Sequence, residues 1–175
     1  MADSVAHNCV EKNSIHKLSD KWTLWAHLPH DTDWSLSSYK KIFDFDTVEE
    51  AIILTETIPH KMTRNCMLFL MRNGITPMWE DPKNRDGGSF SYKVSNKIVP
   101  TAWREISYKL VGETITTTHS FQNAINGITI SPKKNFCVIK VWMANCNSQD
   151  STIIGEVAQG ITNQGCLFKK HNPVY

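Results

Sequence analysis

Short apolar or alternating runs, separated by turn-forming residues, recur along most of the chain. Runs of about four to eight such residues are typical of strands with one or both faces buried. Asn, Gly, Pro and Ser stand at most of the breaks between them. The strands predicted on this basis cover residues 22–25, 42–45, 66–71, 89–94, 124–130, 136–143 and 165–169.

Three other segments have the features of helices. An aspartate and a threonine can cap a helix over 48–58, whose first turn is acidic and which a proline ends. A second helix is predicted over 99–110, where apolar residues recur every three or four positions before Gly112. The same kind of spacing predicts a third helix over 152–161.

The order of these elements indicates an α+β protein. Strands and helices do not alternate, so a mostly antiparallel sheet with helices on one face fits better than a parallel sheet. A chain of 175 residues is long enough for one domain, which we place at 19–175. Residues 1–18 are polar without periodicity and are predicted to form a flexible N-terminal arm.

Charge and cysteine content limit the kinds of ligand and the cellular setting that fit this chain. The chain has 19 Lys and Arg against 17 Asp and Glu, which excludes binding of long nucleic acid by bulk charge but allows a local anion site. Five cysteines without a C-x-x-C pair predict reduced thiols in a cytosolic or nuclear setting and no zinc site. We expect a cytoplasmic location and no cofactor. No apolar run is long enough to span a membrane, and we expect a monomer.

The most informative chemistry lies in a Pro- and Gly-rich loop over 76–88, which contains Trp79 next to Glu80. Trp79 offers a plane for stacking, and the Glu80 carboxylate offers two acceptor oxygens. The edge of guanine presents N1–H and N2–H side by side, which a carboxylate matches, whereas adenine presents an acceptor at N1. The alternative is structural: Trp79 covers the core and the Glu80 side chain is solvated.

Other residues could complete such a site. Trp34 lies in a polar loop and is a candidate second stacking plane, while Trp142 ends a strand and is ambiguous. Lys133 and Lys134 in a predicted hairpin turn, and Lys140 in the strand that follows, could hold phosphates. Equally, lysines at such positions could face only water.

No catalytic motif accompanies these residues, so the chain is not expected to be an enzyme. It lacks the glycine-rich phosphate loops, the nucleophile elbow and the zinc-protease motif. The alternative from the enzyme class is a nucleotide hydrolase in which Glu80 or Asp81 acts with a metal ion.

Several sequence blocks together carry a resemblance to a known family. The most specific are FDTVEE at 45–50 and GITPMWED at 74–81. Further blocks are KWTLW at 21–25, WRE at 103–105 and LVGE at 110–113. Over about residues 16–171 the chain resembles the translation initiation factor 4E family, the mRNA cap-binding proteins.

The resemblance implies a fold and a function. In this family a curved antiparallel sheet holds the cap on its concave face, and three helices pack on the convex face. By position, Trp34 and Trp79 would sandwich 7-methylguanine, Glu80 would read its edge, and Trp142 would touch the N7-methyl group. The expected partner is capped mRNA, recruited for initiation; the alternative is a cap-binding repressor or decoy that does not engage the usual scaffold factor.

The chain departs from the family pattern around the cap phosphates. Ser89 and Val138 occupy positions that are usually basic, and Lys133 aligns with an arginine. The resemblance therefore implies a weaker or rearranged phosphate clamp, made by Lys133, Lys134 and Lys140. Such departures indicate a distant or viral relative.

The convex face departs as well. Family members bind the scaffold factor 4G there, and Ile52 replaces a tryptophan, while Lys17 replaces a proline. We expect a 4G-like scaffold protein or a divergent replacement to bind this face. Its predicted contact residues are His16, Leu18, Val48, Ile52, Arg104 and Tyr108.

Overall fold

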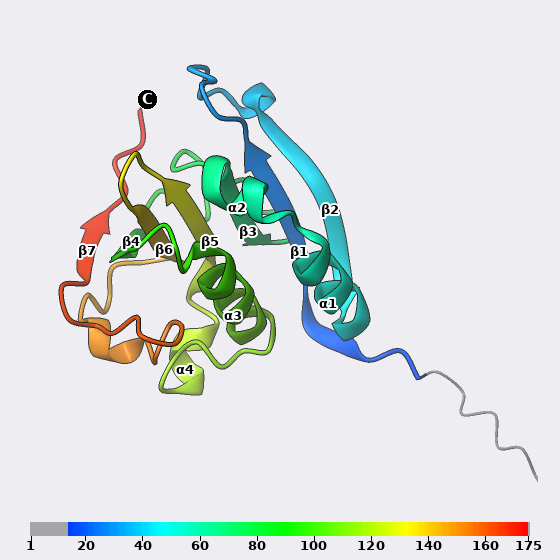
Figure 1. Ribbon diagram of the computed structural model, residues 1–175. Coiled ribbons are helices and arrows are strands. Elements are labelled where there is room, and N and C mark those ends of the chain that lie inside the picture. Colours follow the sequence, from blue (N-terminus) through cyan, green and yellow to red (C-terminus); the bar gives the residue numbers. More distant parts are fainter. Residues whose placement is uncertain (1–13, 175) are drawn as a thin grey trace, which may run out of the picture.

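The computed structural model describes residues 14–174, which form a single sheet with helices on one of its faces (Figure 1). All neighbouring strands are antiparallel, in the order β2-β1-β3-β5-β6-β4-β7. The strands are β1 (Lys17–His27), β2 (Tyr39–Thr47), β3 (Met67–Arg72), β4 (Gly88–Val94), β5 (Ile125–Pro132), β6 (Cys137–Met143) and β7 (Leu167–Lys170).

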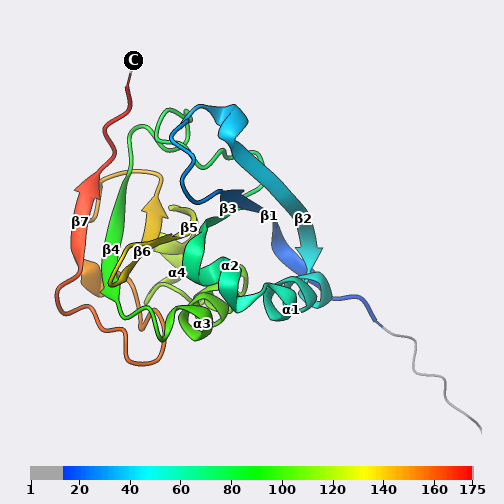
Figure 2. The ribbon, with the colours of Figure 1, turned by 45° about the horizontal axis from the view of Figure 1, so that its top comes forward.

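The helices α1, α2 and α3 lie together on one side of the curved sheet (Figure 2). The predicted α+β class, with an antiparallel sheet and three helices on its convex face, is therefore confirmed. The helices are α1 (Val48–Thr57), α2 (His60–Asn65), α3 (Val99–Val111) and the short α4 (His119–Gln122). Two 3-10 turns cover Leu36–Ser38 and Ser151–Ile153.

Helix α1 begins at a reciprocal cap. The Thr47 hydroxyl accepts from the Glu50 backbone N–H at 3.2 Å, and the Glu50 carboxylate accepts from the Asp46 N–H at 3.2 Å. This arrangement satisfies backbone donors that the first helical turn leaves without partners. The helix predicted over 48–58 is thus confirmed, with its last residue at Thr57.

The prediction of a helix over 152–161 is wrong. Only the 3-10 turn Ser151–Ile153 is helical there, although the apolar residues of the segment are buried. Gly155 and Gly160 weaken a helix, and the Gly155 N–H donates to the carbonyl of Ile115 at 2.9 Å. The apolar spacing therefore reflects burial of an irregular segment.

Helix α2 is the third helix of the layer, and the sequence did not predict it. It is six residues long and follows Pro59 directly, so it is too short to show an apolar period. It packs on α3 and β5.

The sheet buries both of its faces, with different partners. In β3, Leu68 and Leu70 belong to the main core beneath the helices. Phe69 and Met71 point to the opposite face, where they form a smaller buried cluster that includes Trp142. Because side chains alternate along a strand, the concave face receives every second residue of β1, β3, β5 and β6.

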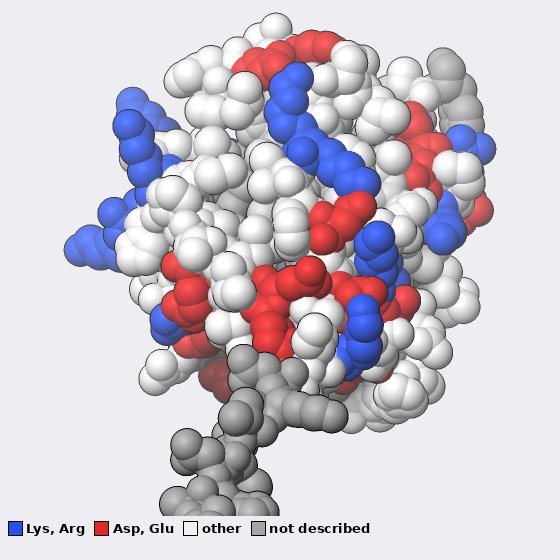
Figure 3. All heavy atoms as spheres, turned by 90° about the vertical axis from the view of Figure 1, so that its right-hand side faces the viewer, with Lys and Arg blue, Asp and Glu red and all other residues white. Residues whose placement is uncertain are grey.

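Strand β2 forms one edge of the sheet and carries charges of both signs. Lys41 pairs with Asp44 at 2.8 Å, and Lys17 of β1 pairs with Asp46 at 2.7 Å. Figure 3 shows basic and acidic side chains intermixed on this side of the molecule. Charges on an edge strand oppose its pairing with the sheet of another chain.

The N-terminal boundary of the sheet lies earlier than predicted. Strand β1 begins at Lys17, so Lys17 and Leu18 belong to the sheet rather than to the arm predicted over 1–18. Residues 1–13 of that predicted arm lie outside the described residues.

Some features are absent from the described residues. Between residues 14 and 174, no helix is long and apolar enough to cross a membrane. In the same range, no three His, Cys, Asp or Glu side chains are grouped so that they could hold a metal ion. The four cysteines within this range are free.

Candidate functional site

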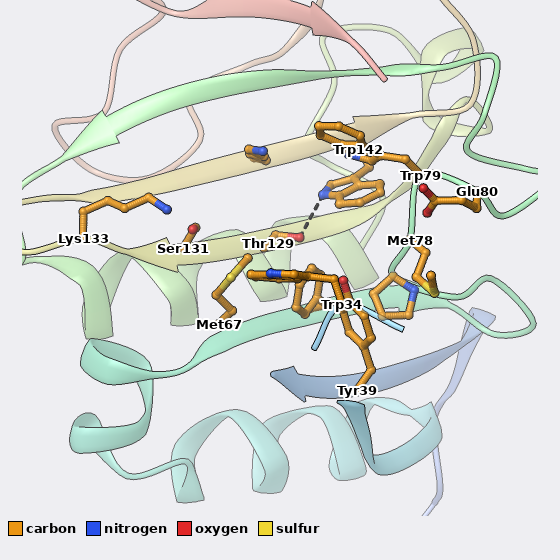
Figure 4. Close-up of a pocket in the computed structure, with 13 residues that line it drawn as sticks. Trp34, Tyr39, Met67, Met78, Trp79, Glu80, Thr129, Ser131, Lys133 and Trp142 are labelled. Carbon is orange, nitrogen blue, oxygen red and sulfur yellow. Dashed lines mark hydrogen bonds between the residues drawn. The ribbon is translucent and has the colours of Figure 1, made fainter. Parts of the chain in front are cut away.

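A cavity of about 360 Å³ opens on the concave face of the sheet (Figure 4). Its walls come from β2, β3, β5 and β6 and from the loops that follow β1 and β3. The candidate residues that it brings together are Trp34, Trp79, Glu80, Lys133, Lys140 and Trp142. Tyr39, Met67, Phe69, Thr129 and Ser131 also line it, and the sequence did not single them out.

Trp34 is held against a buried histidine. Its ring stacks on His27 with a centroid distance of 4.2 Å and an interplanar angle of 4°. His27 Nε2 donates to the Asp33 carbonyl at 2.8 Å, so the support is tied to the same loop. Hydrogen bonds from the backbone and side chain of Ser35 lower the pKa of Asp33. The loop thus fixes a tryptophan whose side chain is still 53% exposed.

Trp79 is supported in the same way from the other side of the cavity. Its ring lies 5.8 Å from the His171 ring at an angle of 13°. His171 Nδ1 donates to the Asn84 carbonyl at 2.7 Å, and Nε2 accepts from the Ser89 hydroxyl at 3.0 Å. Burial lowers the pKa of His171, which favours the neutral imidazole in which Nε2 is the acceptor. Neither supporting histidine was found from the sequence, because their positions have no local signature.

The loop that carries Trp79 and Glu80 has an internal scaffold. One Asp81 oxygen accepts from the Thr76 N–H and hydroxyl, both at 2.7 Å, and the other accepts from the Lys83 N–H at 2.9 Å. The fully buried Asn84 side chain donates to the carbonyls of Thr76 at 2.9 Å and Met78 at 2.8 Å. Asp81 is therefore engaged in holding the loop and does not line the cavity.

The Glu80 carboxylate is half-buried at one end of the cavity. Its Oε1 accepts from the backbone N–H of Val174 at 3.1 Å, so the C-terminal segment reaches this carboxylate. Burial, with a contribution from the Glu80 charge, raises the pKa of Tyr39 to about 12. Tyr39 is consequently neutral at physiological pH and adds a polar but uncharged wall.

Trp142 lies deep in the cavity and is 3% exposed. Its Nε1 donates to the Thr129 hydroxyl at 2.8 Å, and its ring contacts Phe69 edge-on at 6.4 Å (Figure 4). Because its only donor is already used, Trp142 presents an apolar surface to anything in the cavity.

The cationic end of the cavity holds two of the three candidate lysines. Lys140 Nζ lies 5.9 Å from the centroid of the Trp79 ring, and Lys133 lines the rim. Burial lowers the pKa of Lys140, and the charges of Lys133 and Lys169 lower it further. A bound anion would relieve that repulsion. Lys134 is exposed and does not line the cavity, whereas Lys169, which the sequence did not indicate, lies close enough to Lys140 to affect it.

The predicted partner residues follow the N-terminal end of α1. The His16 carbonyl accepts from the Val48 N–H at 2.8 Å, and His16 Nδ1 lies 2.6 Å from the Glu49 carboxylate. Val48 and Ile52 are exposed on the helix, while Leu18 is partly buried against the core. This end of the surface therefore combines exposed apolar side chains with polar contacts to the acidic residues at the start of α1.

The other end of this surface joins α1 to α3. The Tyr108 hydroxyl donates to one Glu56 oxygen at 2.7 Å, and Arg104 lies 3.7 Å from the other. Burial and the Glu56 carboxylate raise the pKa of Tyr108 to about 12. Ile53, 63% exposed beside Ile52, belongs to the same surface and was not predicted.

Comparisons with known proteins agree with this architecture. The family model described as Eukaryotic initiation factor 4E matches residues 17–173. A fission yeast protein, eukaryotic translation initiation factor 4E-2 of Schizosaccharomyces pombe, is 33% identical over 145 residues, covering 77% of this chain. This chain spans 56% of that relative's length. The isoform 4E of Capsicum annuum is 33% identical over 141 residues, covering 77% of this chain and 67% of the pepper protein.

Solved structures give the same result. A Schistosome eIF4E complexed with m7GpppG and 4E-BP has a TM-score of 0.68 at 26% identity, covering 77% of this chain and 75% of that chain. An Ascaris suum eIF4E-3 with m7G cap has a TM-score of 0.68 at 26% identity and 77% coverage of both chains. From the match over nearly the whole described chain, this protein belongs to the eukaryotic initiation factor 4E family.

Proposed function

We propose that this protein binds the 7-methylguanosine cap of mRNA and recruits the mRNA for translation initiation in the cytoplasm. The observation that carries the proposal is that Trp34, Trp79 and Glu80 line the same cavity. The Ascaris and Schistosome relatives, which have the same fold, were solved with an m7G cap and with m7GpppG.

The two tryptophans account for selection of the methylated base. Methylation at N7 gives guanine a positive charge, which an indole face attracts by about 0.5–2 kcal/mol per contact. Stacking adds roughly 1–3 kcal/mol per base regardless of methylation. His27 and His171 leave one face of each indole for the ligand and hold the ring in place. Trp142 supplies the apolar surface against which the methyl group would rest.

Glu80 accounts for selection of guanine over other bases. Its two oxygens accept from N1–H and N2–H, and the charge on the methylated ring strengthens both bonds. The Val174 N–H occupies Oε1 in the structure, so guanine would replace that bond rather than meet a bare carboxylate. Binding alone achieves this function, and no residue is assigned a chemical step.

Lysines alone would hold the phosphates. Lys133 at the rim and Lys140 inside the cavity are the candidates, with Lys169 nearby. A lysine is a point charge that cannot chelate two oxygens as an arginine does. We therefore propose a weak, salt-sensitive contribution from this end.

The convex surface is the proposed site for a protein partner. The Schistosome relative was solved with 4E-BP, and a C. elegans eIF4E-3 was solved with the 4E-binding protein Mextli. On this chain the surface runs from His16 along Val48 and Ile52 to Arg104 and Tyr108. A 4G-like scaffold protein, or a divergent replacement for it, would bind there.

The decisive experiment is a titration with 7-methyl-GTP, followed by quenching of tryptophan fluorescence, with GTP as the control ligand. Strong quenching by micromolar 7-methyl-GTP and weak quenching by GTP would support the proposal. Equal quenching by both, or none, would overturn it. Addition to a cap-dependent translation extract then separates an initiation factor, which stimulates, from a repressor or decoy, which inhibits.

A further inference from the structure

A second cavity borders the cavity lined by Trp34, Trp79 and Glu80, which we call the cap pocket. We propose that this second cavity holds the sugar-phosphate backbone of the RNA that follows the cap. This α2 groove has a volume of about 640 Å³. It is formed by the loop after β1, by helix α2 with its flanking residues, and by the end of β5. The inference rests on the proposed cap-binding function, because it concerns the path of the chain that leaves the cap pocket.

The α2 groove meets the cap pocket at the ends of β3 and β5. Lys133 lines both cavities. Met67 and Ser131 line the cap pocket on the concave face, and their chain neighbours Cys66 and Pro132, which side-chain alternation turns to the opposite side, line the groove. The two cavities therefore share a boundary with a cation on it. A phosphate chain that leaves the pocket would pass Lys133 and turn around the ends of these strands to enter the groove.

The charge of the α2 groove suits a polyanion. Lys61 and Arg64 are exposed on α2, and with Lys133 they make three cations around one cavity, whose lining residues include no acidic side chain. Within residues 14–174, no ion pair joins any of these three cations to a carboxylate. Lys17 and Arg104, by contrast, are paired with Asp46 and Glu56. Cations without a neutralising partner gain most from a phosphate.

The composition of the α2 groove favours the backbone of the RNA over its bases. No Trp, Tyr or Phe lines it, so it offers no series of stacking planes. Arg64 can bind two oxygens of one phosphate, which positions a chain without reading its sequence. An RNA tethered by its cap reaches the groove at a high effective concentration, so even weak contacts add to affinity. The groove therefore extends the footprint on mRNA without regard to sequence.

The test compares 7-methyl-GTP with a capped, unstructured RNA of ten nucleotides by calorimetry at two salt concentrations. The variant is Lys61→Ala with Arg64→Ala, which leaves Lys133 intact and places a good helix former at two exposed positions. The matched control is Lys21→Ala with Lys41→Ala, which removes the same charge beside Asp44 on the β1–β2 edge. Thermal melting confirms that both variants fold.

The unmodified protein is expected to bind the capped RNA about 5–10-fold tighter than 7-methyl-GTP at low salt, because extra phosphates are neutralised. The α2 variant should bind capped RNA no more tightly than 7-methyl-GTP, while its affinity for 7-methyl-GTP stays within about twofold of the unmodified protein. The control variant should keep the tighter binding of capped RNA. The logarithmic salt slope for capped RNA should become shallower by about 1.4, the value for two phosphate contacts on a single strand.

Two results would overturn the inference while leaving the cap function intact. In the first, capped RNA binds no more tightly than 7-methyl-GTP; in the second, the gain survives in the α2 variant. Failure of 7-methyl-GTP to bind the unmodified protein would instead contradict the proposed function, and the inference with it.

Discussion

The two ends of the proposed cap pocket are built on different principles. At the base end, Trp34 and Trp79 are each stacked on a buried histidine, and hydrogen bonds fix the loops that carry them. At the phosphate end, Lys133 is exposed on a turn, and the neighbouring charges of Lys133 and Lys169 lower the pKa of Lys140. The first end is organised before a ligand arrives, whereas the second contributes charge without fixed geometry.

This contrast predicts where specificity and affinity arise. Preorganised groups lose little conformational freedom on binding, so their contacts are expressed almost fully in the affinity. The exposed Lys133 must be ordered by the ligand, and salt screens its charge. The base end should therefore decide both which ligand binds and most of how tightly it binds.

The largest expected effect is at Glu80. Glu80→Gln keeps the shape but turns one acceptor into a donor that faces the guanine N–H groups, so the affinity for 7-methyl-GTP should fall by about 2–4 kcal/mol. Glu156→Gln, an exposed carboxylate elsewhere, is the matched control. Fluorescence titration measures both variants. Retention of affinity within threefold in Glu80→Gln would show that Glu80 does not read the base.

A smaller loss is expected when the loop scaffold is broken without touching the cavity. Asn84→Ala removes the bonds to Thr76 and Met78 and the contact with Asn126, and should lower the affinity by about 1–3 kcal/mol by freeing Trp79 and Glu80. Asn147→Ala, in an exposed loop, should have no effect. Calorimetry and thermal melting together separate lost positioning from lost folding. Unchanged affinity in a folded Asn84→Ala protein would show that the base end is not held by this scaffold.

At the phosphate end, Lys133→Ala should lower the affinity for 7-methyl-GTP by only about 0.3–1 kcal/mol at low salt, and by less at high salt. Lys134→Ala removes the same charge from the same turn but outside the cavity, and should change little. Titration of 7-methyl-GMP and 7-methyl-GTP against both variants measures the effect. An equal loss in the two variants would mean that the turn acts through its net charge and not through Lys133.

An effect of similar size but opposite sign concerns the C-terminal segment. Val174→Pro removes the N–H that donates to Glu80 and should raise the affinity for 7-methyl-GTP by at most about 0.5–1 kcal/mol, because that bond no longer has to be replaced. Val174→Ala keeps the N–H and serves as the control. A loss of affinity in Val174→Pro alone would show that this segment supports the cap instead of competing with it.

The fold, and the presence of Trp79 and Glu80 in one cavity, could be predicted largely from local signals. The residues that cap the N-terminus of helix α1 are close together in the sequence, and the Pro and Gly content of residues 76–88 indicates a loop. Trp79 and Glu80 are neighbours, so their joint appearance in the cavity needs no knowledge of long-range packing.

The features that sequence reasoning missed depend on contacts between distant segments. His27, from β1, lies beneath Trp34, and His171, after β7, lies between Trp79 and Trp142. An isolated histidine carries no periodic signal of such a role. The segment 152–161 shows the opposite failure, because its regular apolar spacing comes from burial of an irregular chain whose hydrogen bonds go to distant partners such as Ile115.

The most direct test of the central claim is calorimetry of GTP, 7-methyl-GMP and 7-methyl-GTP with the unmodified protein under one buffer condition. If the base end dominates, loss of the N7-methyl group should cost more free energy than loss of two phosphates. The cation–π contribution of two indoles is about 1–4 kcal/mol, against about 0.2–1 kcal/mol for each exposed lysine contact. A protein that binds GTP more tightly than 7-methyl-GMP would contradict the account.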